Sequence, residues 1–282
     1  MIDYDAQSSS LYTPALRPTV FSSPAASAAP WVCAEISRLV YAPFERDSAQ
    51  LQRLSGALVT GGFTLMHTFN DADTSTQAIA VRHTVTGQLV IAFRGTEQDG
   101  TDYATLAQVW RVKWQENALV HTGFCKAFNA IWPKITAALG IPALSVAIFT
   151  GHSLGGALAH LAVSHLQSPL AQLITIGSPA VGNDAFVASL SMLTPQRYVN
   201  CCDLVTRLPK DWLGFAPAGA AHYIDRAGQL HTPQSALSAQ AIALDQAQAR
   251  SDYTRTFFLQ SGTAKLRDLA DHAPINYVRA LM

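Results

Sequence analysis

Residues 146–159 combine an apolar run, a tight turn and an Ala/Leu-rich stretch, and they carry a candidate nucleophile. Ser153 is the centre of a Gly-x-Ser-x-Gly sequence at residues 151–155. The apolar residues before it predict a strand, and the Ala/Leu-rich residues after it predict a helix, which is the order that a nucleophile elbow requires. The N–H groups at the start of such a helix favour negative charge. We therefore predict that Ser153 attacks an electrophilic centre at this turn.

A serine hydroxyl needs a base to take its proton and an acid to orient that base. In chains that carry this elbow, the acid and then the histidine follow the serine. Asp203 directly follows the apolar residues 198–202, so it should lie at the carboxyl end of a strand, where open α/β sheets bind ligands. We favour it over Asp184, which we expect to cap a helix, and over Asp225, which falls at a hairpin turn.

Three histidines follow Asp203 and are candidates for the base. His222 lies in an alternating strand, and His231 lies in a loop beside a Thr-Pro pair. His272 follows a helical stretch and lies in a loop late in the chain. We favour His272 on position.

Two backbone N–H groups should stabilise the oxyanion. One belongs to Leu154, the residue after the nucleophile. The second should follow an earlier strand, where Thr96 comes after the apolar residues 88–94. The alternative for Thr96 is that it caps the next turn.

The elements needed to position these residues are visible as alternating strands and helices from 88 to 201, which predict a mostly parallel sheet with helices on both faces. We predict one domain over 1–282, with residues 1–29 as an arm or loose tail. The further expected elements are a helix at 31–41, a helical piece at 44–58, a hairpin of 77–83 with 88–94, an edge strand at 110–114, helices at 184–193 and 235–250, and a second hairpin around 221–228.

Composition excludes some classes of protein. The 282 residues include 19 Lys+Arg and 19 Asp+Glu, so the net charge is zero and nothing suggests nucleic-acid binding. Only 13% of residues are charged, which is compatible with work at a lipid–water boundary and with other settings.

We expect no transmembrane helix. Asp3 and Asp5 stand where a secretory signal would be basic, which predicts a cytoplasmic protein or export by a leaderless route.

The cysteines show no metal or redox spacing. We expect Cys33, Cys125, Cys201 and Cys202 to be free, mostly buried thiols. We expect neither a metal nor a cofactor.

Taken together, the motifs resemble those of the class 3, or fungal-lipase-like, lipase family. The matching segments are 93–96, 120–124, 151–159, 176–183, Asn200 to Val205 with Leu208-Pro209, and Asp271-His272. The resemblance implies an α/β-hydrolase fold with Ser153 as nucleophile, Asp203 as acid and His272 as base. It also implies Thr96 and Leu154 as oxyanion donors, and a short lid at 98–108.

The implied activity is hydrolysis of a carboxylic ester through an acyl-serine, most simply of triacylglycerol or a similar acyl ester at a lipid–water interface. Phospholipase A1 and short-chain or feruloyl esterase remain alternatives, and a non-catalytic or acyltransferase scaffold is a remote one. The residues Trp212, Leu213 and Phe215 either line an acyl pocket or belong to the core. Thr206 stands where the family usually has Pro, and residues 232–262 form a candidate cap insertion.

Overall fold

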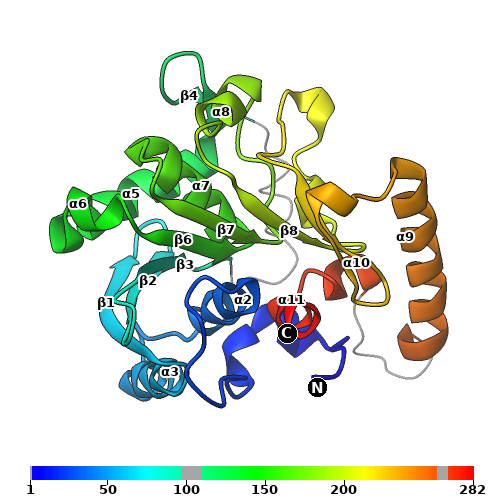
Figure 1. The fold of residues 1–282 in the computed structure, drawn as a ribbon, viewed down its shortest axis with the longest axis horizontal. Coiled ribbons are helices and arrows are strands. Elements are labelled where there is room, and N and C mark those ends of the chain that lie inside the picture. The colour runs from blue at the N-terminus through cyan, green and yellow to red at the C-terminus, as the bar shows by residue number, and fades with distance from the viewer. Residues whose placement is uncertain (1, 97–109, 259–265) are drawn as a thin grey trace.

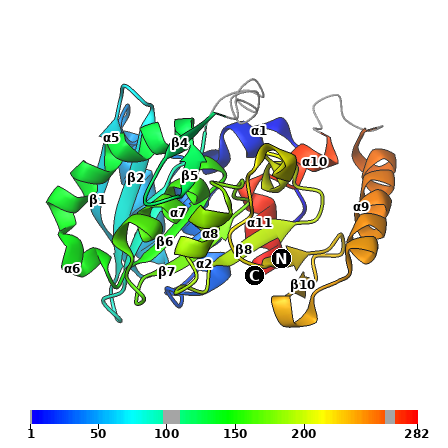
Figure 2. The same cartoon turned by 90° about the horizontal axis from the view of Figure 1, so that it is seen from above.

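The structure is a computed structural model that describes residues 2–96, 110–258 and 266–282 (Figures 1 and 2). Its described residues build an eight-stranded sheet in the order β1-β2-β3-β6-β7-β8-β9-β10. The strands are β1 (Phe63–Asp71), β2 (Thr76–His83), β3 (Leu89–Phe93), β6 (Ile148–His152), β7 (Gln172–Ile176), β8 (Gln196–Asn200), β9 (Ala221–Ile224) and β10 (Leu230–His231).

Strand direction divides this sheet into a parallel centre and two antiparallel edges. The pairs β1–β2, β2–β3 and β9–β10 are antiparallel, whereas β3, β6, β7, β8 and β9 run parallel. The parallel strands place their carboxyl ends at one edge of the sheet, where ligand sites of α/β folds form. The predicted α/β-hydrolase class, with a mostly parallel sheet between helices, is confirmed.

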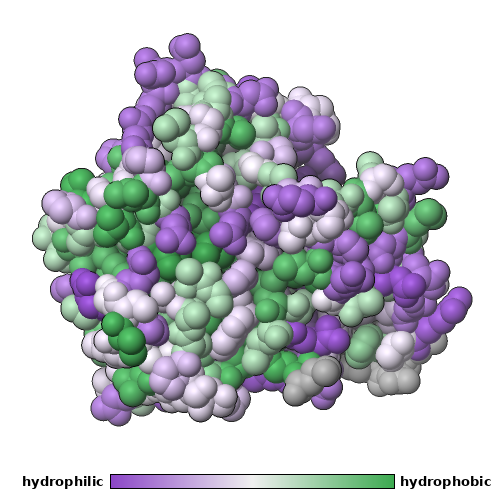
Figure 3. All heavy atoms as spheres, in the orientation of Figure 1, coloured by the Kyte–Doolittle hydropathy of each residue, from purple (hydrophilic) through white to green (hydrophobic). Residues whose placement is uncertain are grey.

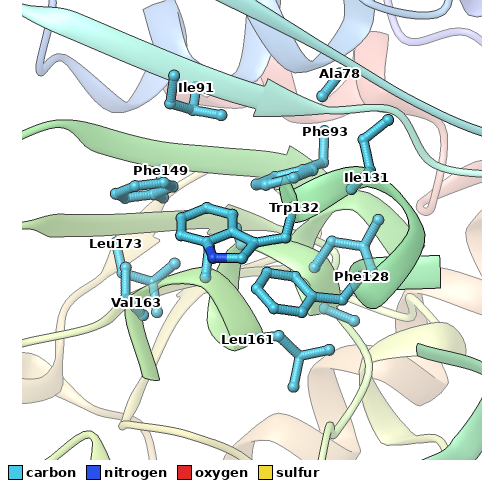
Figure 4. Packing of buried hydrophobic residues seen from close by; sticks show 14 of the residues in the cluster. Ala78, Ile91, Phe93, Phe128, Ile131, Trp132, Phe149, Leu161, Val163 and Leu173 are labelled. Atoms are coloured by element: carbon cyan, nitrogen blue, oxygen red, sulfur yellow. The ribbon is translucent and has the colours of Figure 1, made fainter. Parts of the chain in front are cut away.

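Helices cover both faces of the sheet (Figure 1). One face packs against α2 (Pro30–Leu39), α3 (Ser48–Thr60) and α11 (Pro274–Leu281). The other packs against α5 (Thr122–Leu139) and α7 (Leu154–Leu166), with α8 (Asp184–Ser189) beside them. Figure 4 shows Trp132 and Phe128 of α5 against Phe93 and Phe149 of the sheet. Burying such rings removes much apolar surface from water and holds α5 in place.

The remaining elements lie outside these layers. They are α1 (Ser8–Tyr12), α6 (Ile141–Leu144), α9 (Ala239–Tyr253), α10 (Arg267–Ala270) and the two-stranded sheet of β4 (Arg111–Lys113) with β5 (Leu119–His121). In both views α9 stands at one end of the molecule (Figures 1 and 2), and the face that it presents in Figure 3 is mostly hydrophilic. Within the described residues, no helix has both the length and the apolar character to cross a bilayer.

Several predictions of elements need correction. The alternation at 110–114 forms a strand, β4, which pairs with β5 in a separate two-stranded sheet. The strand β1 was not predicted, α8 ends at Ser189, and α3 starts only at Ser48. The arm at 2–29 packs on the body, since Ala6, Leu11 and Phe21 are buried. The candidate lid lies outside the described residues, as does the end of the candidate cap insertion.

Candidate active site

The turn from β6 into α7 holds Ser153 in a strained conformation. Its φ is 57° and its ψ is −127°, a region that non-glycine residues rarely adopt and that costs about 1–3 kcal/mol. A Cβ at Gly151 would lie 2.2 Å from the carbonyl carbon of Gly155, and a Cβ at Gly155 would lie 2.1 Å from the Phe93 oxygen. Both glycines are therefore required for strand and helix to approach so closely.

Asp203 and His272 meet in a buried hydrogen bond. His272 Nδ1 lies 2.9 Å from Asp203 Oδ2, although 69 residues separate them in the chain. The same oxygen accepts a hydrogen bond from the Tyr277 hydroxyl at 2.5 Å, and Oδ1 accepts one from the Val205 N–H at 2.9 Å. Three donors thus fix the orientation of the carboxylate, which in turn orients the imidazole ring.

Gly177 lies between this pair and the serine turn. It follows β7, has a φ of 58°, and a Cβ there would lie 2.9 Å from Asp203 Oδ2 and 3.2 Å from His272 Nδ1. The Ser153 N–H donates to the Ile176 oxygen at 3.0 Å, one residue before Gly177. The serine turn, the glycine and the Asp–His pair therefore occupy adjacent positions at the carboxyl ends of β6, β7 and β8.

His152, directly before the serine, holds the backbone of His272. Its Nε2 lies 2.6 Å from the His272 carbonyl oxygen, its Nδ1 lies 2.8 Å from the Tyr41 hydroxyl, and the two imidazole centroids are 4.4 Å apart. Burial, reinforced by the nearby His272, lowers the pKa of His152 well below 6.5. The ring is therefore neutral, with Nε2–H donating to the carbonyl and Nδ1 accepting from Tyr41. Sequence reasoning missed this role, because the residue occupies a variable position of the motif.

The predicted oxyanion residues flank the same turn. Leu154 is the first residue of α7. Thr96 is exposed, and the preceding Gly95 lies against the turn, since a Cβ there would lie 2.7 Å from the His152 oxygen. Arg94 anchors this segment, with Nε 2.7 Å from the Val40 oxygen and an ion pair to Glu45. The donor roles of Thr96 and Leu154 stay predictions.

Four other residues were candidates for the acid or the base. His231 Nε2 lies 2.9 Å from Asp225 Oδ2. The His222 ring is tilted by 32° to that of Tyr198, with the centroids 4.8 Å apart, and its buried Nδ1 has no hydrogen-bond partner among the described residues. Asp184 is the first residue of α8, but Asn183 caps this helix, so the predicted cap is wrong. None of these residues is hydrogen-bonded to the Asp203–His272 pair within the described chain.

The three apolar residues predicted for an acyl pocket differ in burial. Trp212 is 78% exposed, whereas Phe215 is 2% exposed. The Phe215 ring packs against His121 and lies under the Arg111 guanidinium. Leu213 is intermediate. Phe215 therefore belongs to the packed interior and Trp212 to the surface, and a contact with substrate stays a prediction for all three.

All four cysteines are free and buried, as predicted. Within the described residues, Cys201, Cys202 and Asp271 form a group whose ligand atoms lie within 4.8 Å of one another. The Asp271 carboxylate already accepts from Arg267 at 2.8 Å and from Tyr4 at 2.8 Å. Because a guanidinium already neutralises this carboxylate, we assign no metal to the group.

Comparison with known proteins agrees with this geometry. Residues 90–212 match the family described as Lipase (class 3). Secreted mono- and diacylglycerol lipase 1 of Fusarium solani is 36% identical over 115 residues, which cover 38% of this chain and 34% of that protein.

Solved structures of lipases are similar to this chain in fold. The Rhizomucor miehei lipase propeptide complex has a TM-score of 0.55 at 27% identity, covering 60% of this chain and 58% of that one. The lipase of Rhizopus microsporus var. chinensis has a TM-score of 0.60 at 23% identity, and the match covers 75% of this chain and 79% of that one. The chain spans less than half the length of the first curated relatives that it matches.

Proposed function

We propose that this chain, a class 3 lipase of the α/β-hydrolase superfamily, hydrolyses carboxylic esters through an acyl-serine, and that residues 1–282 form one catalytic domain. The observation that carries the proposal is the buried His272–Asp203 hydrogen bond beside the strained turn at Ser153. Relatives named as mono- and diacylglycerol lipases support acylglycerols as substrates.

In the proposed mechanism, His272 takes the Ser153 proton as the oxygen attacks the ester carbonyl. The N–H groups of Leu154 and Thr96 stabilise the oxyanion, and the imidazolium protonates the leaving alcohol. Water then attacks the acyl-enzyme by the same proton transfers. Asp203 holds the tautomer of His272 in which Nδ1 is protonated and Nε2 faces the serine.

Replacement of the nucleophile and of the base tests this mechanism. Ser153→Ala and His272→Gln should each lower kcat on a p-nitrophenyl ester by several powers of ten. His231→Gln is a matched control, since that histidine also bonds an aspartate and should leave kcat unchanged. A Ser153→Ala protein that keeps the wild-type rate would refute the mechanism.

Substrate class is tested by a panel of p-nitrophenyl esters from C2 to C16, triolein emulsion and a phospholipid. We expect emulsified long-chain acylglycerol to be hydrolysed, with the rate rising once substrate passes its solubility limit. A preference for C2–C4 esters in monomeric solution would instead identify an esterase, and faster release of acyl chains from the phospholipid would identify a phospholipase A1.

A further inference from the structure

A cavity of about 300 Å³ lies between β8–β9 and the segment that leads into α9, and none of Ser153, Asp203 and His272 lines it. Val199 of β8 and Tyr223 of β9, paired in register, line one side of it. Leu237 and Ile242 line the other side. The volume is at the lower end of the range for small-molecule sites, roughly 300–1,000 Å³. The candidate cap insertion therefore builds a hollow against the end of the sheet.

Arg197 of β8 also lines this cavity. Its Nε is buried without a hydrogen-bond partner, and among the described residues the guanidinium has neither a hydrogen bond nor an ion pair. Burial lowers the pKa of Arg197, while the nearby Tyr277 and Asp203 act in the opposite direction. A partly buried cation without a partner costs folding free energy. An anionic ligand bound to Arg197 would reduce this cost.

The charges around the cavity are unbalanced in sign. Its lining includes Arg197, Arg207 and His231 but no acidic residue. Arg207 is already paired with Asp268, and His231 is hydrogen-bonded to Asp225, so both side chains have partners outside the cavity lining. The charge of Arg197 alone is left for a ligand, which should therefore carry one negative charge.

Most of the remaining lining is apolar, from Val199, Leu237, Ile242 and four Ala or Pro residues. An apolar wall with one cationic group fits a ligand with a hydrocarbon chain and an anionic head. The planar guanidinium matches a carboxylate through two parallel hydrogen bonds.

We propose that this cavity binds a medium-chain fatty acid, with its carboxylate on Arg197 and its chain between the sheet and α9. The origin of this ligand rests on the proposed function, because ester hydrolysis releases such a carboxylate. The binding itself does not depend on catalysis.

The test is calorimetric titration of sodium octanoate into enzyme whose Ser153 has been blocked with a p-nitrophenyl phosphonate, so that the acyl site is filled. We expect one saturable site per chain. Arg197→Gln should weaken binding roughly ten- to a hundredfold, the worth of a charge-assisted hydrogen bond. Ala221→Leu, which narrows the cavity beside Arg197 and keeps the arginine, should weaken it as well and serves if Arg197→Gln does not fold.

Matched controls separate the parts of the proposal. Arg82→Gln removes an arginine from β2, far along the sheet, and should leave octanoate binding unchanged. Octanol, with the same chain and no charge, and inorganic phosphate, with charge and no chain, should not compete. Octanoate binding that survives both Arg197→Gln and Ala221→Leu, or equal competition by octanol or by phosphate, overturns the proposal. Failure of the phosphonate to label Ser153 counts against the proposed hydrolase alone, and octanoate is then titrated into unlabelled enzyme.

Discussion

At the scale of single residues, the Tyr277 hydroxyl joins two parts of the proposed site. It donates to Asp203 Oδ2 and accepts the Asn200 N–H at 3.0 Å. It therefore links the end of β8 to α11, the helix that follows His272. Burial and the neighbouring Asp203 raise the pKa of Tyr277 well above 10, so the hydroxyl stays protonated and remains a donor.

Removing this hydroxyl should cost stability more than activity. Tyr277→Phe leaves a buried N–H without its acceptor, so we expect a loss of about 1–3 kcal/mol in the free energy of unfolding. His272 keeps its carboxylate, so kcat should fall far less than the roughly 10⁴-fold expected for Asp203→Asn, which would impose the wrong tautomer. Urea unfolding and kcat of both variants test this, and an equal loss of kcat would contradict it.

Gly177 offers a sharper test, because a second glycine supplies the matched control. Gly177→Ala adds a methyl group 2.9 Å from Asp203 Oδ2 at a positive φ, so we expect lower stability and a loss of kcat of tenfold or more, on the order of 1–2 kcal/mol of misplacement. Gly87→Ala meets a similar backbone strain, since φ there is 70°, but its added Cβ has no neighbouring atom within 4 Å.

The control should lose stability by about 1–2 kcal/mol and keep its kcat. If both variants lost activity equally, backbone strain rather than contact with the Asp–His pair would be the cause.

At the scale of elements, the strands and helices that carry chemistry were predictable because their patterns are local. The apolar run, the glycines and the Ala/Leu-rich helix at 146–166 appear as predicted. The strand β1 was missed because much of it is exposed, so its sequence lacks a clear apolar alternation. The pairing of β4 with β5 depends on contacts between distant segments that no local pattern records. His272 was preferred to His231 because of its late position in the chain, and it is the histidine that bonds Asp203.

The helix α7 buries a histidine that should make stability depend on pH. Burial lowers the pKa of His160 from 6.5 to about 4. Between these values the unfolded chain binds a proton that the folded chain does not, so stability present above pH 6.5 is lost as the pH falls toward 4. His160→Gln should reduce this dependence.

Thermal unfolding of both proteins from pH 7.5 to 4 measures the effect. The exposed His67 of β1 provides a control, and His67→Gln should retain the wild-type slope. An unchanged slope in His160→Gln would show that other groups cause the acid sensitivity.

At the scale of the whole molecule, the arm of residues 2–29 is tied to the elements around His272. The Asp5 N–H donates to Asn276 Oδ1, and Asn276 Nδ2 donates to the Asp5 and Ala270 oxygens, each at 2.8 Å. The Tyr4 hydroxyl bonds Asp271 next to His272. The N- and C-terminal ends of the chain lie side by side in Figures 1 and 2.

Breaking this tie should release the arm. Asn276→Ala removes the side-chain partner of the Asp5 N–H and of the Asp5 oxygen, both part-buried, so we expect a loss of about 1–3 kcal/mol in stability. Cleavage of the arm in limited proteolysis should also become faster, and kcat should fall because His272 loses its support. Asn129→Ala, at an exposed position of α5, is the control and should change none of these. If the variant were less stable but its arm still resisted cleavage, Asn276 would stabilise the fold without holding the arm, which contradicts the prediction.

The sequence separation between the hydrogen-bonded residues should affect the rate of refolding. The Tyr4–Asp271 bond spans 267 residues, the His152–His272 bond 120 and the His272–Asp203 bond 69. Contacts between such remote segments form slowly, because long loops must close before they contribute. After dilution from denaturant, helical circular dichroism should therefore recover first, and turnover of an ester should return with a measurable lag.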